Sequence, residues 1–159
     1  MQILVLYFSK TGNTKKLAEA IAQGAGEVQG SRAVLKSTSE VSKEDFLSAD
    51  GLVAGSPVYF GSMAAELKQV VDGLISIRKK METKIGAAFA TSGDASGGKE
   101  TTMFSIIQAM LICGMVVSGD PLSATGHYGV ACTGSPDEKN LENGRKLGRR
   151  VAELAMRLQ

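Results

Sequence analysis

Residues 5–21 read VLYFSKTGNTKKLAEAI, and this stretch decides the fold. An apolar run ends in a short polar turn, which leads directly into an amphipathic segment. The turn offers the hydroxyls of Ser9, Thr11 and Thr14, and Gly12 lets the backbone approach a ligand closely. The first N–H groups of a helix have no partners inside the helix and carry partial positive charge. The pattern therefore predicts a strand–turn–helix unit that binds a phosphate.

The turn differs from the loops that bind larger phosphate ligands. It lacks the Gly-Lys-Ser/Thr ending of a nucleoside-triphosphate loop and the three-glycine pattern of a dinucleotide turn. A single phosphomonoester fits better than a triphosphate or a pyrophosphate. The alternative is an ordinary strand–turn–helix unit with a polar turn and no ligand.

The same stretch resembles the flavodoxin signature. The signature has an aromatic, a hydroxyl, a small residue, a Thr, an Ala and an aliphatic residue where this chain has Tyr7, Ser9, Gly12, Thr14, Ala18 and Ile21. In flavodoxins this loop holds the phosphate of FMN. The resemblance implies that FMN is the cofactor and that its phosphate is bound by Ser9, Lys10, Thr11, Gly12, Asn13 and Thr14.

Composition limits the alternatives. The 159 residues have the size of one domain, and we expect a single domain over 1–159. The net charge of +2 is too small to indicate nucleic acid or an anionic membrane as a partner. Cys113 and Cys132 lack metal-ligand spacing, so no metal site is expected. No signal peptide or membrane-spanning stretch is recognisable, and we expect a cytoplasmic protein.

Strand-like runs alternate with helical periodicity along the whole chain. Strands are expected at 3–8, 33–36, 51–56, 85–90 and 115–117, and apolar stripes at helical spacing lie within 17–25, 67–74, 103–111 and 141–158. A helical turn is expected near 44–47. Ser135 is expected to cap the last helix, with Pro136 at its first position. This alternation predicts an α/β fold, a three-layer sandwich with a five-stranded parallel sheet and helices on both faces. The strand order 2-1-3-4-5 is implied by the resemblance.

Three polar loops are predicted to meet. Ligands of open parallel sheets bind beyond the carboxyl ends of the strands, beside the switch in strand order. The segments 9–14, 56–62 and 91–98 leave such ends and are rich in glycine or hydroxyl groups. Because strands 1, 3 and 4 are expected to be neighbours, the three loops would border one crevice.

The resemblance implies flavin contacts from the second and third loops. These contacts fall on Ser56, Pro57, Val58, Tyr59, Phe60 and Gly61, and on Thr91, Ser92, Gly93, Asp94, Gly97 and Gly98. Tyr59 and Phe60 would flank the flavin ring, or instead anchor the loop in the core. Asp94 would bond the flavin, or instead cap its own turn. The third loop has no aromatic residue, which would leave one face of the ring open to a hydride donor or a substrate.

Two functions fit these features. The first is a flavodoxin-like electron carrier that serves redox partner proteins, which the short chain favours. The second is an NAD(P)H:quinone oxidoreductase similar to the WrbA branch, which segments 93–98 and 126–131 and the near-neutral charge favour. WrbA enzymes are longer, and their insertions help to build a tetramer; a monomer or homodimer is expected here. A binding module that has lost its flavin is a third possibility, against which the intact first loop argues.

His127 and Tyr128 are the candidates for catalytic residues. His127 is the only histidine, and both residues are expected on the loop after strand five, near the mouth of the flavin site. His127 would donate a hydrogen bond to a quinone or to the reduced flavin. The alternative is an exposed loop residue without a function.

Overall fold

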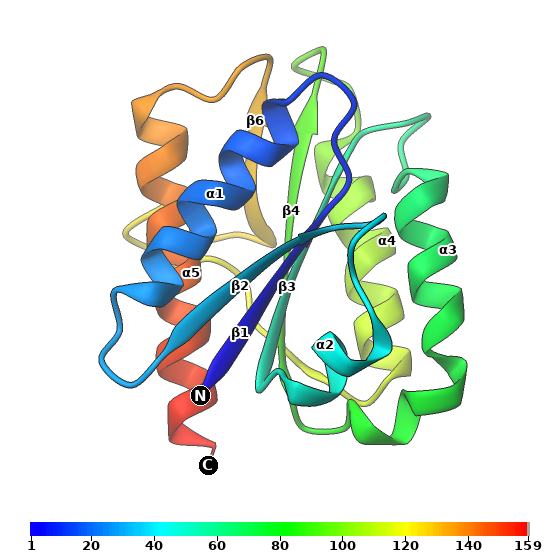
Figure 1. The fold of residues 1–159 in the computed structure, drawn as a ribbon. Coiled ribbons are helices and arrows are strands. Elements are labelled where there is room, and N and C mark those ends of the chain that lie inside the picture. Colours follow the sequence, from blue (N-terminus) through cyan, green and yellow to red (C-terminus); the bar gives the residue numbers. More distant parts are fainter. Residues whose placement is uncertain (159) are drawn as a thin grey trace.

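The computed structural model, which describes residues 1–158, is built around one parallel sheet (Figure 1). Its strands lie in the order β2-β1-β3-β4-β5, and β6 also pairs with β4. The elements along the chain are β1 (Gln2–Tyr7), α1 (Asn13–Gly26), β2 (Arg32–Ser37), α2 (Lys43–Ser48), β3 (Gly51–Pro57), α3 (Ala65–Gly73), the 3₁₀ helix η1 (Leu74–Lys80), β4 (Ile85–Ser92), α4 (Lys99–Ile112), β5 (Val116–Val117), β6 (Gly129–Thr133) and α5 (Glu138–Arg157). The predicted flavodoxin-like α/β fold and strand order are confirmed.

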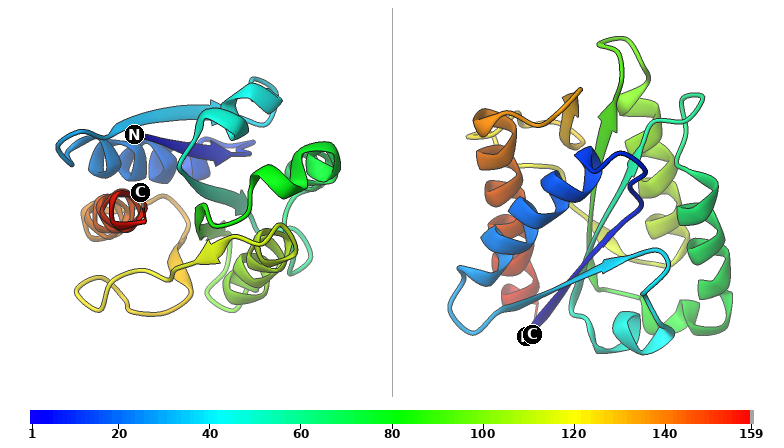
Figure 2. Two further views of the ribbon diagram at one scale, coloured as in Figure 1. Left: turned by 90° about the horizontal axis from the view of Figure 1, so that it is seen from below. Right: turned by 45° about the horizontal axis from the view of Figure 1, so that its top comes forward.

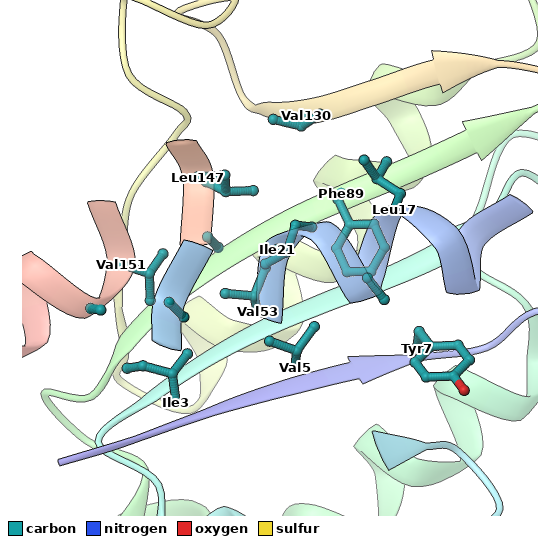
Figure 3. Close-up of a cluster of buried hydrophobic side chains, with 14 of the residues drawn as sticks. Ile3, Val5, Tyr7, Leu17, Ile21, Val53, Phe89, Val130, Leu147 and Val151 are labelled. Atoms are coloured by element: carbon teal, nitrogen blue, oxygen red, sulfur yellow. The ribbon is translucent and has the colours of Figure 1, made fainter. Parts of the chain in front are cut away.

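Helices cover both faces of the sheet. Figure 2 shows α1 and α5 on one side, and α3 and α4 on the other. The side chains of β1 alternate between the two layers: Ile3 and Val5 face α1 and α5, whereas Leu4 and Leu6 join the opposite cluster. Because both faces are covered, the central strands are apolar almost throughout. Figure 3 shows the cluster beneath α1 and α5, where Phe89 of β4 lies between the strands and α1.

Helices α1 and α5 cross at very short range. A Cβ atom on Gly148 would lie 1.9 Å from the carbonyl oxygen of Ile21, and one on Gly24 would lie 2.0 Å from the carbonyl oxygen of Arg145. Only glycine permits backbone to approach backbone so closely at these two positions. The crossing fixes the position of α1, whose first turn lies at the carboxyl edge of the sheet (Figure 1).

The fifth strand position differs from the prediction. A single strand at 115–117 was expected, but two short strands fill this position. β5 pairs with the start of β4 at Ile85 and Gly86, and β6 pairs with the remainder from Ala88 to Ser92. The segment 118–128 lies between them. A run of only five residues that starts with glycine has the appearance of a loop, which is why the sequence did not reveal β6.

The start of α5 also differs from the prediction. Asp137, not Ser135, is the cap, and Pro136 precedes the helix. The Asp137 carboxylate accepts a hydrogen bond of 2.8 Å from the Asn140 amide, and the Asn140 side chain accepts one from the Asp137 amide. This reciprocal pair satisfies two backbone donors, which a cap at Ser135 would leave open. Within residues 1–158, no helix is both long enough and apolar enough to cross a membrane.

Candidate functional site

The first loop has the geometry of an anion site. Gly12 has φ +96°, a left-handed conformation that favours glycine, and it directs the chain into α1. Its amide donates a 3.1 Å hydrogen bond to Ser9 Oγ, which folds the loop over the helix start. Thr14, in the first turn, is 1% exposed.

The first turn of α1 differs from those of the other helices. It has no side-chain cap and no acidic residue. By contrast, α2 and α5 each begin with a capping box, and each of α2 to α5 carries an acidic residue in its first turn. The start of α1 therefore has free N–H groups and no negative charge of its own, which suits an external anion such as a phosphate.

The second loop is a tight hairpin that projects an aromatic side chain into solvent. Tyr59 and Ser62 exchange two backbone hydrogen bonds of 3.1 Å, and Phe60 (φ +51°) and Gly61 (φ +75°) form the tip. Positive φ at both tip residues is typical of a type I′ turn. The Phe60 side chain is fully exposed, whereas Tyr59 is 38% exposed and has its ring centroid 6.3 Å from that of Phe8. Phe60 therefore does not anchor the loop in the core.

The third loop is held by its own backbone. Ser92 Oγ donates a 2.6 Å hydrogen bond to the Asp94 carbonyl, which also accepts a 3.2 Å bond from the Gly97 amide. Gly98, with φ +94°, precedes α4, which also begins without a side-chain cap. The Asp94 carboxylate forms no hydrogen bond within residues 1–158, so the main chain of Asp94, not its side chain, shapes this turn.

The three loops meet at the carboxyl edge of the sheet, as predicted (Figure 2, right). Thr14 Oγ1 of the first loop lies 2.8 Å from Thr91 Oγ1 at the start of the third. The Val58 amide of the second loop donates a 2.8 Å hydrogen bond to the Thr91 carbonyl. The tip of the second loop also touches the end of the third, since a Cβ on Gly98 would lie 3.0 Å from the Cα of Gly61.

A fourth loop, which the sequence analysis missed, borders the same edge. It follows β6, and the Gly134 amide donates a 2.8 Å hydrogen bond to the Ser92 carbonyl. Lys99 at the start of α4 donates to Thr133 Oγ1 over 2.7 Å, and Lys16 of α1 donates to Ser135 Oγ over 3.4 Å. The Thr-Gly-Ser-Pro-Asp turn at 133–137 was the signal that a polar loop lay here.

His127 and Tyr128 are not brought to these loops. They precede β6 and lie near its amino end, not beyond a carboxyl end as expected. Gly129 pairs with Ala88, four residues before the end of β4, which is about 13 Å along the strand. In Figure 1 the yellow segment 118–128 accordingly lies beside α5 and below the upper edge. The Tyr128 ring packs on Phe104 of α4, with centroids 4.4 Å apart.

The segment 118–128 is organised by one buried carboxylate. Asp120 accepts hydrogen bonds from the amides of Thr125, Gly126 and His127 over 2.8–3.0 Å, and from the Thr125 hydroxyl. Burial by itself would raise the pKa of Asp120, but these four hydrogen bonds outweigh it and hold the pKa below its usual range. The His127 amide is thus used to build the loop.

Neither cysteine lies in an environment that favours the reactive thiolate form. Burial raises the pKa of Cys132, which lies near the fourth loop, to about 11. Burial likewise raises the pKa of Cys113 at the far end of α4. Both thiols are therefore protonated near neutral pH, and thiolate is the reactive form. The polar chemistry at the carboxyl edge comes from hydroxyl, amide and lysine groups.

The family model for NADPH-dependent FMN reductases matches residues 1–129, which include the first three loops. The chain belongs to this family. It is an FMN-binding, flavodoxin-like redox protein that transfers electrons through a non-covalent flavin. The geometry of the first loop and of α1 fits the phosphate that such a cofactor carries.

Relatives of this FMN reductase family member align with nearly all of its residues. A flavodoxin of Aquifex aeolicus is 39% identical over 158 residues, which cover 96% of this chain and 85% of the relative. An NAD(P)H dehydrogenase (quinone) of Archaeoglobus fulgidus is 34% identical over 188 positions, which cover 99% of this chain and 98% of the relative.

Solved structures agree with this fold. A flavodoxin from the domain Archaea is 27% identical, with a TM-score of 0.82 and coverage of 98% of this chain and 99% of that one. The WrbA-like flavodoxin of Agrobacterium tumefaciens has a TM-score of 0.86 and coverage of 99% of both chains. At 23% identity, the latter likeness shows the fold alone.

Proposed function

We propose that this chain is an electron carrier, in which FMN exchanges electrons with redox partner proteins. The observation that carries this proposal is that the chain aligns with a flavodoxin almost without gaps, but with a quinone dehydrogenase only across inserted positions. The alignment with the Aquifex flavodoxin needs 158 positions, whereas the alignment with the Archaeoglobus quinone dehydrogenase needs 188 for a chain of 159 residues. The quinone dehydrogenase therefore has inserted segments that this chain lacks.

The FMN phosphate is proposed to lie at the first turn of α1. Ser9 Oγ accepts a hydrogen bond from the Gly12 amide, so its own proton remains available to a phosphate oxygen. The free amides of the first turn add further donors, and Lys10 adds positive charge at the exposed rim.

The flavin ring is proposed to lie between the second and third loops. The exposed side chains of Tyr59 and Phe60 form one wall, and the backbone of 91–98 forms the other. FMN supplies reversible redox chemistry when bound, and the chain orients the ring and shields it from water. Because the site lies at an open edge of the sheet, a partner protein can approach the ring within electron-transfer distance.

A second candidate function is an NAD(P)H:quinone oxidoreductase. One specific observation favours it: residues 91–98 contain no aromatic side chain that would cover the outer face of the ring. An open face gives room for a nicotinamide or a quinone. The names of the matching family and of the Archaeoglobus relative support the same chemistry.

The two functions differ in their direct reaction with NAD(P)H. The FMN-loaded protein is mixed anaerobically with NADH or NADPH alone, with free FMN under the same conditions as the control, and the absorbance of oxidised flavin is followed. The carrier proposal requires the absorbance to persist until a separate reductase is added. Rapid bleaching would reject the carrier and support the oxidoreductase. A protein that cannot be loaded with FMN would reject both.

A further inference from the structure

Thr91 occupies an unusual place in β4. Every second residue of this strand points toward α1 and α5. Before Thr91, the residues on this face are apolar and buried: Ile85, Ala87 and Phe89. Thr91 is the next residue on the same face of β4, beneath the first turn of α1, and its side chain is 4% exposed. A hydrogen bond stabilises a hydroxyl in this position, because an unpaired buried hydroxyl costs free energy.

The partner of Thr91 is the hydroxyl of Thr14, 2.8 Å away and 77 residues earlier in the chain. Each hydroxyl has one proton to donate and can also accept. The bond between them uses one of the two protons. Within residues 1–158, no other hydrogen-bond acceptor contacts either hydroxyl. If Thr91 donates, the Thr14 oxygen accepts, and the Thr14 proton is available to an anion at the helix start.

The Ser9 hydroxyl shows the same arrangement. Its oxygen accepts from the Gly12 amide, which leaves its proton free for donation. With Thr91 as the donor, both hydroxyls that flank the start of α1 accept a hydrogen bond from the protein. Such polarised chains of hydrogen bonds strengthen one another in a buried setting.

We propose that Thr91 is a positioning residue for the FMN phosphate. It acts through Thr14: its hydroxyl donates to Thr14 Oγ1 and so fixes the Thr14 hydroxyl as a donor to a phosphate oxygen. The Thr91 hydroxyl itself does not touch the flavin. This inference rests on the proposed position of the FMN phosphate at the first turn of α1.

The proposal separates FMN from riboflavin, which lacks the phosphate. Dissociation constants for both flavins are measured by quenching of flavin fluorescence, for the wild type and for Thr91→Val. We expect the variant to bind FMN about three- to ten-fold more weakly, the effect of about one neutral hydrogen bond, and to bind riboflavin as the wild type does. Thr91→Ser retains the hydroxyl and should restore FMN affinity.

Two further variants make the test specific. Thr102→Val is the matched control, since Thr102 is also fully buried near this edge but its hydroxyl has no partner within residues 1–158; both affinities should stay unchanged. In a Thr14→Val background, Thr91→Val should have no further effect on FMN binding, because the Thr14 hydroxyl through which Thr91 acts is absent. If Thr91→Val does not fold, Thr91→Ala takes its place.

Several results would overturn the proposal. These are an unchanged FMN affinity in Thr91→Val, an equal loss for FMN and riboflavin, no rescue by serine, or a loss that persists without the Thr14 hydroxyl. The equal loss would show a merely structural role. If the wild-type protein binds neither flavin, the FMN site itself is wrong, and this result is distinguished from the others by the wild type alone.

Discussion

Replacing Gly148 of α5 with alanine tests how closely α1 and α5 must pack to hold the phosphate loop in place. The added Cβ would lie 1.9 Å from the Ile21 carbonyl oxygen and 2.8 Å from the Ala25 amide nitrogen. Both obstacles belong to the backbone of α1, so no side-chain rotation relieves them. Because real Cβ contacts under 3.0 Å essentially never occur, the helices must separate by more than about 1 Å.

The separation loosens a fully buried layer. Leu17, Ile21, Leu147 and Val151 are each 0% exposed and lie along this crossing. Overpacking of a core lowers the free energy of unfolding by about 1–3 kcal/mol. Alanine in place of glycine in a helix raises it by about 1 kcal/mol. Because a backbone atom moves aside less readily than a side chain, we expect the overpacking cost at Gly148 to exceed this range. We expect Gly148→Ala to lower the free energy of unfolding by about 2–3 kcal/mol.

Urea unfolding of the FMN-free protein, followed by circular dichroism, measures this change. Gly26→Ala is the control, because nothing lies within 4 Å of a Cβ at that last residue of α1. It should leave stability unchanged or raise it by about 0.5–1 kcal/mol. If Gly148→Ala is as stable as the wild type, the two helices do not need their close contact.

Three further predictions concern single side chains. Asp120→Asn retains only one acceptor oxygen, so we expect stability to fall by about 1.5–3 kcal/mol. Because the folded pKa of Asp120 lies below its ordinary value of 3.8, this difference should be constant at neutral pH and shrink as the pH falls through the folded pKa. Lys84→Met removes three hydrogen bonds of 2.5–2.9 Å to carbonyls at the end of α2, and should cost about 1–3 kcal/mol in urea unfolding. Phe60→Ala should leave the melting temperature of the FMN-free protein unchanged and weaken FMN binding by about 1–2 kcal/mol in fluorescence titrations.

Each of these predictions has an outcome that contradicts it. A stability difference for Asp120→Asn that stays constant down to the acid limit would show that its charge is not what holds segment 118–128. An unchanged midpoint for Lys84→Met would mean that α2 does not depend on this lysine. Equal FMN affinity in Phe60→Ala would place the flavin ring away from the hairpin tip.

The sequence determined the features that depend on neighbouring residues. The phosphate loop at 9–14 could be predicted because a strand end, a turn and a helix start are local, and Gly12 and the hydroxyls follow one another directly. The helical stripes were equally visible because amphipathic periodicity records which face is buried. The three glycine- and hydroxyl-rich loops were found in the same way, and the strand order implied by the resemblance placed them together.

The tertiary structure alone decided the contacts between distant segments. β6 was missed because a strand of five residues is defined by its pairing with β4, not by its own composition. The split of the fifth strand places Tyr128 beside Phe104. His127 and Tyr128 were expected at the flavin mouth because this split leaves no signal in the sequence. The same holds for the bond between Thr14 and Thr91. The sequence does not show that two threonines 77 residues apart form a hydrogen bond, because the packing of the layers decides the burial and direction of their side chains.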